Sequence, residues 1–65
     1  MKETPLDSNR IALSDTYLTY EAAERARDNY LRSYHPWGYG TAFAPIHYVQ
    51  GYYVLKGTRR ANCDD

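Results

Sequence analysis

The stretch from Thr19 to Gly40 constrains the fold most, because it reads as one helix with a defined start and a defined end. Thr19 is a suitable N-cap, since its hydroxyl can accept a hydrogen bond from a backbone N–H two or three residues later. Pro36 cannot continue a helix and pushes the residue before it out of the helical region. Gly38 and Gly40 then permit a tight reversal of the chain. We therefore predict a helix at about residues 19–34, followed by a turn.

This predicted helix carries one apolar stripe whose members recur at intervals of three and four residues. The stripe consists of Ala23, Ala26, Tyr30, Leu31 and Tyr34. Its alanine end allows close approach to a sheet, and its tyrosine end fills a wider gap. The other side carries acidic and basic side chains together, a pattern typical of a solvated face. The helix is therefore expected to pack on a sheet through the stripe.

Strand-favouring residues on both sides of the helix predict three antiparallel strands, at 10–16, 41–49 and 52–58. Pro45 cannot donate to a strand ladder, so the second of these strands belongs at an edge. The third strand has no proline and is the most apolar, which favours the central position. The predicted fold is α+β, a β-α-β-β domain with one helix on a three-stranded antiparallel sheet in the order 1-3-2.

The dipeptide Gln50-Gly51 predicts a tight hairpin between the last two strands and so sets their register. Counting outward, Val49 faces Tyr52, and the two faces of the hairpin follow by alternation. The face assigned to the core collects Ala42, Ala44, Ile46, Tyr48, Tyr53 and Leu55. The uncovered face collects Phe43, Pro45, His47, Val49, Tyr52, Val54 and Lys56. A slip of one residue would exchange the two faces.

Length and charge limit the remaining possibilities. The 65 residues make one small domain, with residues 1–9 expected as a flexible arm and 59–65 as a flexible tail. Eight basic and eight acidic residues cancel, so no overall field attracts nucleic acid or an anionic membrane. No apolar run approaches the ~18 residues of a membrane span, and the N-terminal residues lack the apolar segment of a signal peptide. We expect a cytoplasmic protein without a membrane anchor.

The residues that carry catalytic chemistry do not form a recognisable set. His35 and His47 have no acid at a spacing typical of a triad or a metal site, and Gly38-Tyr39-Gly40 lacks the lysine of a phosphate loop. A single cysteine, Cys63, cannot form an intrachain disulfide or a cysteine-rich zinc site. We predict no enzyme activity, no metal and no cofactor.

The aromatic residues are the informative feature. Eight tyrosines, one tryptophan and one phenylalanine exceed what a single helix-on-sheet core can hold. Tyr30, Tyr34, Tyr48 and Tyr53 are expected inside. The remaining aromatics and their neighbours form the predicted partner-binding surface, which comprises Trp37, Tyr39, Phe43, His47, Tyr52, Val54 and Lys56. Such rings give large contact area at low entropic cost.

Several alternatives remain open for these residues. Trp37 and Tyr39 could fold back and plug the core, and the uncovered sheet face could join two copies in a homodimer. The same face could also bind single-stranded nucleic acid, with Lys56, Arg59 and Arg60 contacting phosphates. Because affinity for phosphates needs several cations, three of them on a neutral chain argue against nucleic-acid binding.

In format, the chain resembles the very short single-domain proteins that phages and mobile elements use against bacterial defence, anti-CRISPR proteins in particular. The resemblance rests on small size, the lack of a catalytic set and the aromatic surface, with no residue motif, so no site is carried over. It implies a non-enzymatic, stoichiometric inhibitor that occludes a bacterial nuclease or CRISPR-Cas complex in the host cytosol. The neutral charge argues against mimicry of DNA.

Overall fold

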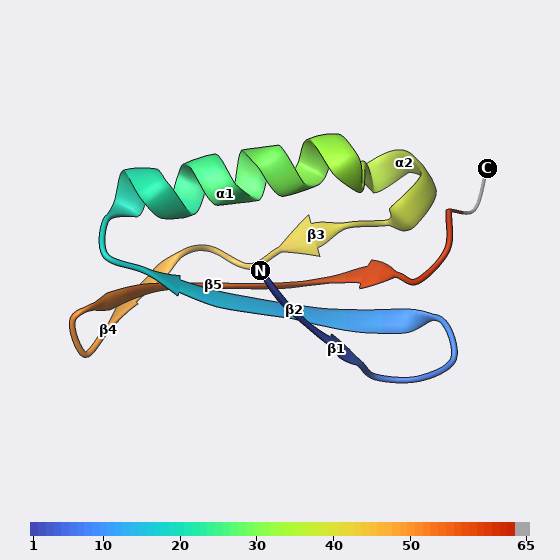
Figure 1. The fold of residues 1–65 in the computed structure, drawn as a ribbon, viewed down its shortest axis with the longest axis horizontal. Coiled ribbons are helices and arrows are strands. Elements are labelled where there is room, and N and C mark those ends of the chain that lie inside the picture. Colours follow the sequence, from blue (N-terminus) through green and yellow to red (C-terminus); the bar gives the residue numbers. More distant parts are fainter. Residues whose placement is uncertain (64–65) are drawn as a thin grey trace.

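Two helices lie on one side of an antiparallel sheet in the computed structural model, which describes residues 1–63 (Figure 1). The elements in chain order are β1 (Lys2–Pro5), β2 (Arg10–Tyr17), α1 (Tyr20–Ser33), α2 (Pro36–Tyr39), β3 (Ala42–Phe43), β4 (His47–Val49) and β5 (Tyr52–Arg60). The predicted α+β class is confirmed. The sheet order is β1-β2-β5-β3, with β4 also paired to β5. It differs from the prediction by an additional edge strand and by a break in the second predicted strand.

The central helix begins and ends where the capping signals place it. The Thr19 hydroxyl accepts a hydrogen bond from the backbone N–H of Ala22 at 3.1 Å, and Tyr34 follows the last helical residue. Ala23 on the predicted stripe is fully buried, and α1 packs against β2 and β5. The predicted turn after Pro36 contains the short helix α2, which Gly40 ends in the left-handed conformation, at φ +60°.

The predicted flexible arm is wrong over residues 2–5, because β1 pairs with β2 along its whole length. Pro5 ends this edge strand, where a missing N–H is tolerated. The predicted flexible tail is also wrong at its start, since β5 continues through Arg60. Residues 64 and 65, the end of that tail, lie outside the described residues.

The hairpin register is confirmed at its tip and shifted by one residue beyond it. Val49 pairs with Tyr52 around Gln50-Gly51, as predicted, but Phe43 pairs with Gly57. Between these pairs, residues 44–46 of one strand span only two residues of β5, which defines a bulge around Pro45.

The bulge reverses the face on which the residues before it lie. Phe43 was predicted on the uncovered face, but it pairs with Gly57 on the side that faces the helices, and its ring meets that of Tyr30 edge-on at 5.9 Å. Ala42 and Ala44 were predicted in the core and are exposed. Gly57 permits this arrangement, because a β-carbon there would lie 2.6 Å from the Phe43 ring.

The fully buried apolar core of residues 1–63 is small. Leu13 of β2 and Leu55 of β5 are its largest members, and Ala23 of α1 covers them. Tyr48 was predicted inside this core but is 66% exposed. It belongs to the edge strand β4, whereas α1 packs over β2 and β5, so the helix leaves Tyr48 uncovered.

Candidate protein-binding surface

The residues of the predicted partner-binding surface do not lie together. Trp37 is on α2, whereas Tyr52 begins β5 at the β4–β5 turn, at the opposite end of a molecule that is 37 Å long (Figure 1).

The turn at the α2 end separates its two aromatic residues. Trp37 is 91% exposed. Tyr39 is half-buried, with its ring edge-on to the rings of Tyr34 at 5.0 Å and His35 at 5.7 Å. The sequence left open whether these two side chains lie at the surface or fold back onto the core. Trp37 lies at the surface, and Tyr39 is partly buried.

Four of the predicted residues do share the uncovered face. Tyr52, Val54 and Lys56 alternate along β5 with residues that face the helices, and His47 pairs with Val54. Phe43 does not belong with them, since the bulge turns it toward the helices. We call the side of the sheet away from the helices the open face.

The largest gathering of exposed apolar side chains lies at the end of the β4–β5 hairpin. Among the described residues, seven large apolar side chains are exposed, and five of them come from this end. These five, which we call the hairpin patch, are Leu18, Tyr20, Tyr48, Val49 and Tyr52. The patch wraps around the end of the hairpin, because Tyr48 lies on the side of the helices whereas Val49 and Tyr52 lie on the open face.

Ring contacts hold the patch in shape. Tyr53 lies behind it and meets Tyr48 at 5.0 Å and Tyr20 at 6.0 Å, each with the ring edge-on. Tyr17 pairs with Tyr53 across the strands, and its hydroxyl donates to Asp15 at 3.1 Å. Burial and this hydrogen bond raise the pKa of Tyr17 to about 12, so its phenol stays protonated. Two of the exposed rings, those of Tyr20 and Tyr48, thus rest against the ring of Tyr53.

Four members of this patch were missing from the predicted partner-binding surface, although one of them, Val49, was placed on the uncovered face. Leu18 and Tyr20 flank the helix cap, and Tyr48 alternates into the face assigned to the core. The sequence does not indicate which strands of the sheet the helix covers. Helix α1 begins at Tyr20 and lies over β2 and β5, so the tip of the outer strand β4 projects past it.

A buried polar cluster at the other end of α1 explains why β1 is ordered. Arg59 is only 6% exposed and reaches three elements. Its Nε donates to the Tyr30 hydroxyl at 2.6 Å, and its Nη2 donates to the Glu3 carboxylate. The guanidinium also lies 4.0 Å from the centre of the Tyr34 ring. Arg59 therefore joins β1, β5 and α1, the kind of planar, multivalent contact for which arginine is suited.

The protonation behaviour of the cluster follows from these contacts. The hydrogen bond from Arg59 lowers the pKa of Glu3 below its usual 4.5. Burial raises the pKa of Tyr30, and its hydrogen bond to Glu3 acts in the same direction. Burial alone would lower the pKa of Arg59, but its hydrogen bonds to Tyr30 and Glu3 outweigh that effect and raise it. The cluster thus holds an ionised pair at neutral pH.

The pH dependence of stability should report this pair. Because the pKa of Glu3 is lower in the folded chain, the unfolded chain takes up a proton first as the pH falls. The stabilisation is thus present above about pH 4.5 and is lost as the pH falls through the folded pKa. We expect less than about 1 kcal/mol, since the Glu3 side chain is 38% exposed. Denaturation of Glu3→Gln between about pH 3 and 7 should show a flatter dependence than wild type, whereas the surface variant Glu21→Gln should follow wild type. Parallel curves for wild type and Glu3→Gln would contradict the assignment.

The guanidinium groups of the two arginines proposed for phosphate contact donate hydrogen bonds to other groups of this chain. Arg59 is buried in the cluster, and the Arg60 guanidinium donates to the Gly38 carbonyl through Nε at 3.3 Å and Nη2 at 3.0 Å. The structure therefore leaves Lys56 as the one exposed cation of that predicted set, because Arg60 is half-buried against α2.

The two histidines have different surroundings. His35 caps α2, with its Nδ1 accepting from the Gly38 N–H at 3.1 Å, and His47 is exposed on the open face. Within residues 1–63, no three metal-ligating side chains come together in a way that could hold an ion. No helix in that same range is both long and apolar enough to span a membrane.

Comparison of this chain with protein-family models, with curated proteins and with solved structures finds no match.

Proposed function

We propose that the chain is a non-enzymatic protein-binding module that docks on its partner through the hairpin patch. The observation that carries this proposal is the gathering of five of the seven exposed large apolar side chains at one end. Small proteins rarely leave such a patch in water unless it meets another surface. Tyrosine is also among the residues that dominate binding energy in protein interfaces.

The order of the patch supports this role. Tyr48 and Tyr20 both contact the ring of Tyr53, so their positions are set before a partner arrives. A side chain that is already held loses less conformational freedom on binding. Tyr20 and Tyr48 therefore combine the chemistry and the prior order that suit the centre of an interface.

For the partner, we propose a bacterial nuclease or a CRISPR-Cas effector, which the chain inhibits by occluding it. This partner class follows from the chain's format and from its aromatic surface. A second copy of the chain is the alternative occupant, since β4 also leaves a sheet edge beside the patch.

The test is a titration of target cleavage by a panel of purified CRISPR-Cas effectors with wild type, Tyr48→Ala and Trp37→Ala. Tyr48→Ala should weaken inhibition by about 2 kcal/mol, roughly thirtyfold, if Tyr48 is a hot spot. Trp37→Ala removes a larger exposed ring at the opposite end and should leave inhibition unchanged.

Two results would contradict this proposal. If Trp37→Ala abolishes inhibition and Tyr48→Ala does not, the docking surface is the α2 end. If no effector is inhibited and sedimentation shows a dimer that Tyr48→Ala dissociates, the patch serves self-association instead.

A further inference from the structure

The charges of this neutral chain are segregated between the two faces of its sheet. The exposed cations Lys2, Arg10 and Lys56 lie on the open face. Within residues 1–63, the acidic residues lie elsewhere: Glu3 and Asp15 face the helices, Asp7 is in the β1–β2 loop, and Glu21, Glu24 and Asp28 are on α1. The open face is thus positive although the whole chain is not.

The strand register fixes how these cations are spaced. Ser14 pairs with Lys2 on one side and with Lys56 on the other, so the two lysines stand in one row. Two strand spacings separate them, about 10 Å. Arg10 lies four residues from Ser14 along β2, about 13 Å away. None of the three takes part in a salt bridge among the described residues.

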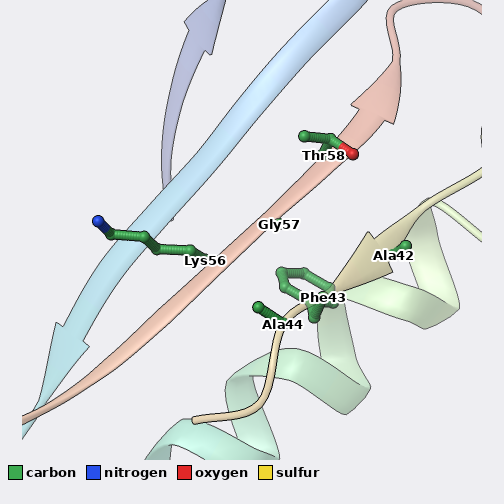
Figure 2. A pocket seen from close by; sticks show the side chains of 6 residues that line it. All are labelled: Ala42, Phe43, Ala44, Lys56, Gly57 and Thr58. Atoms are coloured by element: carbon green, nitrogen blue, oxygen red, sulfur yellow. The ribbon is translucent and has the colours of Figure 1, made fainter. Parts of the chain in front are cut away.

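Aromatic and small side chains complete the face. Tyr52 lies four residues along β5 from Lys56, with about half of its surface exposed, and His47 is nearby on β4. Where β3 pairs with β5, an open hollow of about 420 Å³ is lined by Ala42, Ala44, Lys56, Gly57 and Thr58, and also by Phe43, which is turned toward the helices. Figure 2 shows Lys56 and Thr58 on either side of Gly57, with Ala42, Phe43 and Ala44 across from them.

From this arrangement we infer that the open face binds a short segment of single-stranded nucleic acid. Lys2, Lys56 and Arg10 contact phosphates, and Tyr52 stacks on a base. Three cations scattered over a neutral chain would argue against nucleic acid, but these three share one face on which no acidic side chain among residues 1–63 lies, and this local charge favours a polyanion. A single strand is favoured over a duplex because a ring on a sheet surface stacks only on a base that has left its own helix.

The inference predicts a measurable binding reaction. A fluorescein-labelled oligothymidine of about 20 nucleotides should gain anisotropy with the full chain at about 50 mM NaCl. The logarithm of the binding constant should fall with the logarithm of the salt concentration with a slope of about −2, as three phosphate contacts to a single strand require. Lys56→Gln should weaken binding about fivefold and make the slope shallower by about 0.7. Tyr52→Ala should weaken it about tenfold.

Arg25→Gln is the matched control, because it removes one positive charge from the exposed side of α1. It should bind as wild type does, and circular dichroism should show all variants folded. An anisotropy that does not change at about 100 µM protein would overturn the inference. Equal weakening by Lys56→Gln and Arg25→Gln would overturn it as well, since binding would then follow net charge alone.

Discussion

Replacing Arg59 with alanine should lower the free energy of unfolding by about 3 kcal/mol, a large fraction of the stability that a domain of this size has. The change removes the donors to Tyr30 and Glu3 and the cation that lies over the Tyr34 ring. Hydrogen bonds to charged groups contribute about 1.5–3 kcal/mol each, and a cation over a ring adds about 1 kcal/mol. The partial exposure of Glu3 keeps the total near the lower end of values for a broken buried pair.

Urea denaturation of Arg59→Ala and Arg25→Ala, side by side with wild type, measures this effect. Arg25 is exposed on α1, so its replacement should stay within about 0.5 kcal/mol of wild type. Arg59→Lys should recover little, because an ammonium group cannot serve several fixed acceptors as the guanidinium fork does. An Arg59→Ala variant as stable as wild type would mean that the cluster does not hold β1, β5 and α1 together.

Replacing Gly57 with alanine should also lower the free energy of unfolding by about 3 kcal/mol, the upper end of the range for overpacking. The new β-carbon would lie 2.4 Å from the Ala42 carbonyl oxygen and 2.6 Å from Cδ1 of Phe43. The first of these contacts is with backbone, so the β3–β5 pairing itself must shift. Alanine also restricts the unfolded chain, but that gain is about 0.4–1 kcal/mol and does not offset the clash.

Thermal denaturation of Gly57→Ala beside Lys56→Ala separates the clash from a general effect of altering β5. Lys56 is exposed on the open face, and its replacement should change stability by about 0.5 kcal/mol at most. A Gly57→Ala variant that melts at or above the wild-type temperature would show that Phe43 does not lie across Gly57, and the reversal of faces at the bulge would lose its support.

Local signals in the sequence were enough for the helix and for the tip of the hairpin. Thr19 and Pro36 mark the ends of α1 because capping and the proline ring act within a few residues. Gln50-Gly51 sets the pairing of Val49 with Tyr52 for the same reason. Each of these features depends on neighbours in the chain, so a reading of the sequence can find it.

The features that the sequence did not predict depend on distant partners. Glu3 meets Arg59 across 56 residues, so neither looks like part of the core when the sequence is read locally. The bulge around Pro45 resets the alternation of faces, and a simple count from the turn therefore misplaces Phe43. The position of Tyr48 at the surface depends on where α1 crosses the sheet, which periodicity does not specify.

For the candidate site, the sequence shows the excess of aromatic side chains but not how the fold arranges them. An excess of aromatic side chains was apparent, and Tyr52 lies in the hairpin patch as well as on the open face. The fold places Trp37 at the opposite end and turns Phe43 inward, so the predicted surface becomes two separate regions. Arg59, which the sequence interpretation treated as an exposed cation able to contact phosphate, is buried and is not part of that surface.

The proposed docking role of the hairpin patch is tested most directly by hydrogen exchange of the chain with and without an effector that the titration identifies as its partner. Bound partner should slow exchange in the segments that carry the patch, residues 17–20 and 47–53, and leave the α2 segment, residues 36–40, as fast as in the free chain. Protection confined to residues 36–40, with exchange at 47–53 unaltered, would contradict the proposal and place the interface at Trp37.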